Sequence, residues 1–426
     1  MQQLNLNDSR EHKIKLFLIG ICLFPSFLVN LNIHFINLLD INLALPIQAF
    51  AIITGLVIFR EQLLVTYREH KHSINLLALF NIWIWVSALC SHYENIAIKF
   101  AFKYTLYFAL FFLFLVLTHQ LKQYSRFIEC YQLILYYLII LTLFGFIEKI
   151  NPDASLFIWL RPPDLLFNDA FPTSRVLSLL QNPNDFGALM ALGLVLSIVF
   201  YKQKNLSTSQ FVFTALALTA NIIFSASRNA WISLLIIGLF ALIYYKLLRG
   251  KYLYLILAFT ITFFIFNPQS LNRITQSIYV LPQNLNKINS YFQNAEVAEE
   301  YPPHRILIWT IAIEQFKQYP LTGIGPQGLA EGFFANHPQV KSGMNAHNLI
   351  LGILVEFGLP GLLIFCSLLY CFLHSVDYSN PLWTLPMLTM FMVQIFDYFI
   401  HALPFVTIML LIIALTTNSK FIENIL

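Results

Sequence analysis

His347 is the most distinctive of the residues in this chain that could do chemistry. It follows a polar, glycine-bearing stretch that begins at Lys341, and it directly precedes a long apolar segment. This pattern predicts a titratable side chain at a boundary between water and membrane, where such residues commonly serve a function. Three interpretations are open: a packed or capping histidine, a metal ligand, or a general base that takes a proton from a hydroxyl near neutral pH.

Three arginines could recognise phosphate, because a guanidinium group is always charged and binds phosphate oxygens in a bidentate manner. Arg228 stands in FSASRNAW between two apolar segments, Arg305 opens a helical pattern, and Arg175 begins RVLSLLQNPNDFG. The alternative for Arg228 is an anchor that holds a helix end at the membrane interface. The alternative for the other two is a solvated side chain.

Several neighbouring polar residues allow a structural and a functional interpretation. Asn348 could cap a helix or bind a sugar hydroxyl. Lys99 and Lys103 share one helix face and could be interfacial anchors or a minor phosphate contact. Asp397 and His401 mark the outer end of an apolar segment and could be structural or could line a cavity.

The sequence shows no set of histidines, cysteines and carboxylates at metal-ligand spacing. A short glycine-rich stretch, LTGIGPQG, lacks the Gly-Lys-Ser/Thr ending of a P-loop. We therefore expect neither a metal ion nor a cofactor at the site.

Composition indicates the setting of these residues. The chain of 426 residues is 58% hydrophobic and only 11% charged, whereas a soluble domain has roughly 25% charged residues. Runs of about 20 apolar residues recur along its length, so we predict an all-α, polytopic membrane protein. The net charge of +4 is small and scattered, which argues against a nucleic-acid partner.

Hydropathy predicts twelve spans in a single membrane domain that covers residues 1–426. Nine of the spans precede the long loop and lie within about 14–267, and three follow it and lie within about 347–417. They are placed at about 14–33, 42–59, 75–91, 101–118, 128–147, 185–201, 209–225, 229–248, 251–267, 347–373, 380–398 and 403–417.

The distribution of lysine and arginine predicts the orientation. With the N-terminus inside, fourteen of these residues fall in cytoplasmic segments, and only Lys99, Lys103 and Arg228 fall in short outer segments. Both termini are then cytoplasmic, and the long loops, about 148–184 and 268–345, face the other side. The second loop, between spans 9 and 10, contains PPHRILIWTIAIEQFKQYP, which proline residues frame as one helix. Its apolar stripe of Trp309, Ala312, Phe316 and Tyr319 is predicted to lie on the membrane surface or to pack on the bundle.

Three motifs in order resemble a known family: SASRNAW, then HRILIWTIAIEQFKQYPLTGIGPQG in the long loop, then NAHNLILGILVEFGLPG. The chain resembles the O-antigen ligase family of bacterial inner-membrane glycosyltransferases, also called the Wzy-C superfamily. RVLSLLQNPNDFG is similar to the family's R…N-P-N stretch, so the resemblance covers about residues 175–365.

The resemblance implies a GT-C-type fold in the bacterial inner membrane, with a periplasmic loop that forms part of the active site. It implies inverting, metal-independent transfer of a glycan from undecaprenyl diphosphate to an acceptor hydroxyl. His347, Arg228 and Arg305 would be catalytic. From the chemistry of their own side chains, Arg175, Asn348 and Lys103 are predicted to bind donor or acceptor.

The acceptor implied first is lipid A-core, which would make the enzyme a ligase in lipopolysaccharide biosynthesis. The alternatives are a polymerase of O-antigen or capsule repeat units and an O-oligosaccharyltransferase that modifies pilin or another protein. Outside this family, twelve spans would also fit a transporter, but no pair of broken helices in matching halves is visible.

Overall fold

The computed structural model describes residues 2–23, 44–119, 121, 124–151, 175–180, 182–245, 261, 265, 305–333, 345–395, 397–398 and 402–423. All regular elements within these residues are helices. They are α1 (Gln2–Leu23), α2 (Ala44–Ile58), α3 (Arg60–Glu69), α4 (Lys71–Leu89), α5 (Glu94–His119), α6 (Tyr124–Ile150), α9 (Pro183–Lys202), α10 (Thr208–Ser225), α11 (Arg228–Tyr244), α15 (Arg305–Gln318), the π-helical turn η2 (Gly328–Phe333), α16 (Leu349–Ser375), α17 (Pro381–Ile395) and α18 (Leu403–Glu423).

Six of these helices are long and apolar enough to cross a membrane. They are Lys71–Leu89, Glu94–His119, Arg126–Ile150, Pro183–Lys202, Thr208–Ser225 and Leu349–Ser375. The predicted span at 251–267 lies outside the described residues, except for Ile261 and Ile265, which are helical. Each of the other predicted spans overlaps a helix. The chain is therefore an all-helical membrane protein in its described part, and the number of twelve spans stays a prediction.

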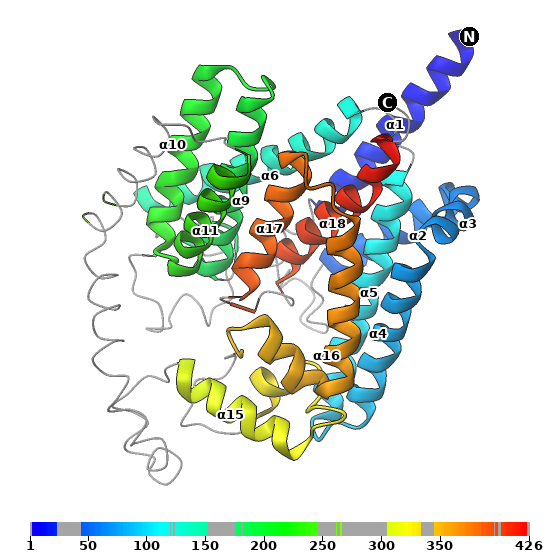
Figure 1. Cartoon of the computed structure of the whole chain (residues 1–426), viewed down its shortest axis with the longest axis vertical. Helices are drawn as coiled ribbons and strands as arrows, with labels where there is room; N and C mark the ends of the chain where they lie inside the picture. The colour runs from blue at the N-terminus through cyan, green and yellow to red at the C-terminus, as the bar shows by residue number, and fades with distance from the viewer. Residues whose placement is uncertain are drawn as a thin grey trace.

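Figure 1 shows the arrangement of the helices. Helices α9, α10 and α11 form one group, α4, α5 and α16 form another, and α17 and α18 lie between them. The start of α1 and the end of α18 lie at one end of the molecule, and α15 lies at the other. This agrees with a topology in which both termini share one face and the loop helix lies on the opposite face.

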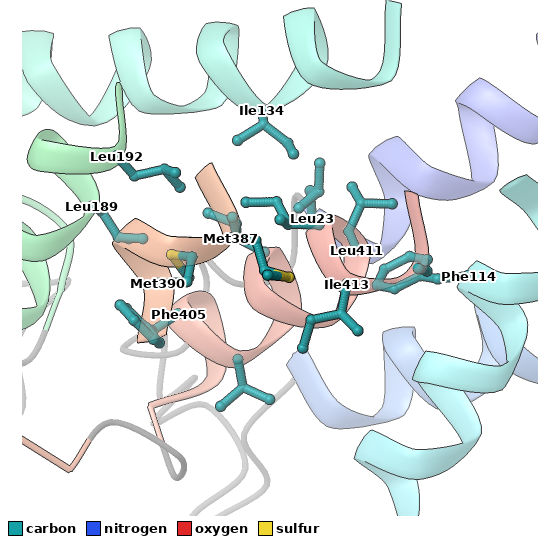
Figure 2. Close-up of a cluster of buried hydrophobic side chains, with 14 of the residues drawn as sticks. Leu23, Phe114, Ile134, Leu189, Leu192, Met387, Met390, Phe405, Leu411 and Ile413 are labelled. Carbon is teal, nitrogen blue, oxygen red and sulfur yellow. The ribbon is translucent and has the colours of Figure 1, made fainter. Parts of the chain in front are cut away.

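The interior is filled by large aliphatic, methionine and phenylalanine side chains. Figure 2 shows side chains from α1, α5, α6, α9, α17 and α18 that converge between the two groups: Leu23, Phe114, Ile134, Leu189, Leu192, Met387, Met390, Phe405, Leu411 and Ile413. Because lipid is as apolar as these residues, their burial stabilises the bundle mainly through close packing. Phe50 and Phe213, by contrast, are 69% and 74% exposed, as expected of side chains that face lipid.

Helix α3 is an element that the hydropathy pattern does not predict. It follows α2 directly and is bent from it by 90°. Its ten residues begin at Arg60 and include Glu61, Arg68 and Glu69, so it is too short and too polar to span a membrane. Its direction, perpendicular to α2, suits a helix that lies along the interface.

Helix α16 is broken at Gly358, whose φ of 67° and ψ of −172° are non-helical. A Cβ at this position would collide with the carbonyl oxygen of Leu321. Beyond the break, Pro360 has no N–H to donate, and the N–H of Leu359 bonds to the Pro320 carbonyl at 2.9 Å. The carbonyls of residues 355–357 therefore need partners from outside the helix.

Those partners come from the loop before α16 and from α4. The bonds are Ile324 N to Val355 O at 3.0 Å, Gly325 N to Glu356 O at 3.0 Å, Ser87 Oγ to Glu356 O at 2.8 Å, and Trp83 Nε1 to Phe357 O at 2.8 Å. A carbonyl without a partner in an apolar medium costs several kcal/mol. The glycine-rich turn and the broken helix are thus one structural unit, which fixes the loop against the helix that follows His347.

Candidate active site

The site centres on a hydrogen bond between His347 and Asp397. Nδ1 of His347 lies 2.6 Å from Oδ1 of Asp397, fifty residues later in the chain. His347 has a left-handed backbone, with φ of 48°, and Asn348 after it caps α16. A histidine held in this sparsely populated conformation commonly marks a functional site, because the surrounding structure must enforce the strain.

Asp397 is 2% exposed, yet four groups neutralise or solvate its carboxylate. Besides His347, it accepts hydrogen bonds from Tyr398 N at 2.9 Å and from Asn184 Nδ2 at 3.1 Å, and Arg305 Nη2 lies 4.0 Å away. Burial by itself would raise the pKa of Asp397, but the His347 hydrogen bond and charge, then Arg305 and the Tyr398 amide, bring the pKa below its ordinary value. The carboxylate is therefore ionised at neutral pH.

An ionised carboxylate can only accept hydrogen bonds, so Nδ1 of His347 must carry the hydrogen. In the neutral imidazole the lone pair then lies on Nε2. The imidazole side chain is 26% exposed, whereas that of Asp397 is 3% exposed. The pair thus fixes one nitrogen inside the protein and leaves the other able to act as a base, as in other carboxylate–histidine pairs.

Arg305 reaches this pair from the first turn of α15. Its side chain is 40% exposed, so one side of the guanidinium faces outward while Nη2 lies near Asp397. Helix α15 is docked by Ile308, Ile311 and Ala312, which are at most 2% exposed. Trp309 donates its Nε1 hydrogen to the carbonyl of Ala346 at 2.8 Å, directly before His347.

The prediction of which residues form the buried face of α15 is partly wrong. Ala312 is buried, but Trp309 is 37% exposed, and Ile308 and Ile311 take the inner positions. Two locations were predicted for this helix, the membrane surface and the bundle. The structure shows α15 packed on the bundle, against α16.

Arg175 is linked to the His347–Asp397 pair through Asn184, which donates a hydrogen bond to Asp397. Its Nη2 donates to Asn184 Oδ1 at 2.9 Å, and its Nε donates to the Ser225 carbonyl at 2.9 Å. The first bond orients the Asn184 amide so that its Nδ2 hydrogens face Asp397. The NPN stretch therefore supports the carboxylate, and binding of donor or acceptor by Arg175 stays a prediction.

Arg228 begins α11 and is exposed. The turn before it is tight, because Ala226 has a left-handed φ of 49° and Ser227 caps α11 through its side chain. Asn229 Nδ2 donates to the Val393 carbonyl at 2.8 Å, which ties this turn to the end of α17 shortly before Asp397. The turn is thus fixed near the site, and convergence of Arg228 with Arg305 on one ligand stays a prediction.

The other two predicted binding residues have clear structural surroundings. Asn348 accepts from Leu351 N at 2.9 Å and donates to the Ile395 carbonyl at 3.2 Å, so it caps α16 and links it to α17. The ammonium of Lys103 lies 5.4 Å and 5.9 Å from the ring centroids of Phe100 and Tyr107 on α5. Roles in substrate binding remain predictions for both.

Sequence reasoning did not assign Asp397 and Asn184 to the site. Asp397 was noted with His401, which lies outside the described residues, but its partner proved to be His347. The signal was present: a carboxylate at the outer end of an apolar segment needs a cationic or hydrogen-bonding partner.

Tyr398 connects this site to the break in α16. Its amide bonds to Asp397, and its hydroxyl donates to Glu356 Oε2 at 3.0 Å, although both side chains are almost fully buried. Gly352 lies against the ring of Tyr398, where a Cβ would clash. The position of Asp397 therefore depends on the same broken helix that holds the loop.

Comparison with known families gives an independent result. Residues 212–366 match the family model of the O-antigen ligases. The resemblance to the O-antigen ligase family is confirmed. The matched segment is about a third of the chain and contains Arg228, Arg305, His347 and Asn348, whereas Arg175, Lys103 and Asp397 lie outside it.

No curated protein matches the chain. The O-antigen ligase match supports a glycosyltransferase-like enzyme that acts on glycans or lipid-linked substrates in general.

Proposed function

We propose that this protein is an O-antigen ligase-like glycosyltransferase of the bacterial inner membrane. It transfers a glycan from undecaprenyl diphosphate to an acceptor hydroxyl, with lipid A-core as the acceptor, on the periplasmic face. The observation that carries this proposal is the hydrogen bond of 2.6 Å between His347 and the buried Asp397, beside the half-exposed Arg305.

In the proposed reaction, Nε2 of His347 takes the proton of the acceptor hydroxyl. The acceptor oxygen attacks the anomeric carbon from the face opposite the diphosphate, and the bond between that carbon and the diphosphate oxygen breaks. The configuration at the anomeric carbon is thereby inverted. Asp397 stabilises the imidazolium that forms and keeps the ring in place.

The leaving diphosphate gains negative charge as its bond to the sugar breaks. Arg305 and Arg228 would stabilise that charge, because fixed cationic donors bind the transition state more strongly than the ground state. Arg305 has an outward face for this purpose, and Arg228 is exposed at the start of α11. The sequence prediction of metal-independent transfer rests on these two guanidinium groups.

A cavity farther along α15 suits the glycan. Its volume is about 170 Å³, and it is lined by His92, Tyr93, Gln315, Gln318, Tyr319, Gly323, Ile324 and Phe333. Side-chain amides can donate and accept hydrogen bonds with sugar hydroxyls, and aromatic rings offer apolar faces. We assign this cavity to sugar units distant from the diphosphate.

The test is transfer by the purified protein from an undecaprenyl-diphosphate-linked glycan. Acceptors offered in parallel are lipid A-core, the donor's own repeat unit and a pilin. Wild type should modify lipid A-core without a membrane gradient. His347→Gln keeps a hydrogen-bonding side chain but cannot act as a base, so it should lose at least about 100-fold of the rate.

His374→Gln, at the far end of α16, is the matched control and should retain activity. Transfer only to repeat units or only to pilin would replace the ligase by a polymerase or a protein glycosyltransferase. If the protein binds the donor but transfers glycan to none of the acceptors, the proposed function is overturned. If His347→Gln is fully active, the assignment of His347 as the base is overturned.

A further inference from the structure

A second cluster of titratable side chains lies far from Asp397. Glu69 ends α3, His70 joins α3 to α4, and His119 ends α5. One possible ligand atom from each residue lies within 4.8 Å of the others. Helix α5 begins beside the turn that contacts the loop at Ile324, so His119 lies roughly 37 Å along α5 from that end.

The hydrogen bonds around Asn418 determine the orientation of its amide. The hydroxyl of Thr118 donates to the Phe114 carbonyl at 2.7 Å, so its oxygen accepts from Asn418 Nδ2, also at 2.7 Å. The same nitrogen donates to the Leu115 carbonyl at 3.1 Å. The atom of Asn418 that faces His70 is therefore the carbonyl oxygen Oδ1.

This orientation fixes the tautomer of His70. Nε2 of His70 lies 2.7 Å from Asn418 Oδ1, and because an amide oxygen only accepts, Nε2 must donate. The lone pair of the neutral ring is then on Nδ1. A histidine held in this way by an acceptor on its remote nitrogen is typical of metal ligands.

The other two side chains face the same point. Nδ1 of His119 lies 3.2 Å from Oε2 of Glu69, and the rings of His70 and His119 meet edge to face with centroids 6.3 Å apart. The His119 side chain is 10% exposed and that of Glu69 is 33% exposed. The cluster is thus closed on the protein side and open to solvent at the carboxylate, where an ion could enter.

We propose that Glu69, His70 and His119 bind one divalent transition-metal ion of the zinc type. Two imidazole nitrogens and one carboxylate oxygen suit Zn²⁺, with water at the open fourth position. The ion would tie the turn between α3 and α4 to the end of α5, and through Asn418 to α18. This site is separate from the glycosyltransferase chemistry. The sequence did not reveal its three residues as a group, because Glu69 and His70 precede His119 by 50 and 49 residues.

The test is metal binding by the full-length, tag-free protein in detergent after removal of metal by a chelator. Titration calorimetry with Zn²⁺ should give one site per chain, and Co²⁺ should give visible absorption typical of a tetrahedral site. Glu69→Gln and His119→Gln should weaken Zn²⁺ binding at least about 10-fold. Zn²⁺ should raise the Tm of wild type by several degrees and leave the Tm of these variants almost unchanged.

His72→Gln is the matched control, since His72 is exposed on α4 two residues after His70. It should bind Zn²⁺ like wild type. Glu69→Gln changes a partly exposed side chain, so it keeps the test valid even if His119→Gln does not fold. Absence of a stoichiometric site in wild type, or equal affinity in wild type and Glu69→Gln, would overturn the proposal and leave Glu69 and His119 as an ion pair only.

Discussion

A histidine that acts as a base and also keeps its position needs a separate nitrogen for each task. His347 meets this requirement because Nδ1 is held by Asp397 and Nε2 carries the lone pair. Asp397 in turn depends on Asn184, Tyr398 and Arg305. The functional unit at the residue scale is therefore the charged pair with its supporting hydrogen bonds.

Asp397→Asn tests this pairing through the rate and the pH dependence of transfer. The pKa of Asp397 is lowered, so its carboxylate is ionised at neutral pH and the charged pair is lost only as the pH falls through that lowered pKa. Asparagine does not titrate, so the variant should lack this acid loss of activity. The rate at the optimum should fall on the order of 10²- to 10⁴-fold.

A purely structural carboxylate would give a different result. Asp397→Asn would then lower the amount of folded protein without a change in the shape of the pH–rate profile. The profile of Glu148→Gln, which alters a buried carboxylate on α6 that accepts a hydrogen bond from the Ser178 amide, provides the comparison.

The two proposed diphosphate ligands are tested by Arg305→Lys and Arg228→Lys. Lysine keeps the charge but loses the bidentate geometry, so each variant should reduce transfer by about 100-fold with normal membrane insertion. Arg60→Lys on α3, also exposed, is the control and should be fully active. Near wild-type activity of both variants would refute the diphosphate clamp.

At the scale of elements, the decisive feature is the break in α16. Gly358→Ala would place a Cβ against the Leu321 carbonyl at a φ of 67°. The strained backbone and the clash should destabilise the protein by about 2 kcal/mol or more. Gly20→Ala on α1 is the control, because its Cβ would meet nothing within 4 Å, and alanine there should stabilise the helix by up to about 1 kcal/mol.

Thermal unfolding in detergent measures both variants, and transfer assays add a second readout. Gly358→Ala should also impair transfer, since Tyr398 links the broken helix to Asp397. Equal Tm values for Gly358→Ala and wild type would show that the break does not require glycine.

Sequence patterns predicted the long helices well, because runs of apolar residues need no information about distant neighbours. They did not predict α3, a helix of ten residues with charged side chains at both ends, which gains its position from α2 and α5. They identified His347 and Arg305 as candidate catalytic residues but did not predict the hydrogen bond between His347 and Asp397. That pairing depends on how α16 and α17 pack, which hydropathy alone does not specify.

At the scale of the whole molecule, the open question is on which side of the membrane the His347 site lies. Ser91 at the end of α4 donates to the Ile324 carbonyl, so this end of α4 shares a face with the loop. Cys90 is exposed at the same end, and Lys71 is exposed at the start of the helix. The predicted orientation places Cys90 at the periplasmic end of α4 and Lys71 at its cytoplasmic end.

A membrane-impermeant thiol reagent distinguishes the two sides. In intact spheroplasts, wild type should be labelled and Cys90→Ser should lose that labelling. A Lys71→Cys substitution in the Cys90→Ser background should be labelled only after lysis. The reverse pattern would invert the topology and place the His347 site in the cytoplasm.

The broken helix also limits how this protein can be recombined with its relatives. Residues 355–357 receive hydrogen bonds from Ser87 and Trp83, and from the loop at Ile324 and Gly325. A chimera that takes the loop from one protein and α16 from another combines a loop and a broken helix that did not evolve to hydrogen-bond to each other. We expect grafts that cut between residues 325 and 355 to fail in expression, and grafts that exchange 320–361 together with the end of α4 to succeed. Acceptor preference would then have to be transplanted in blocks with these boundaries.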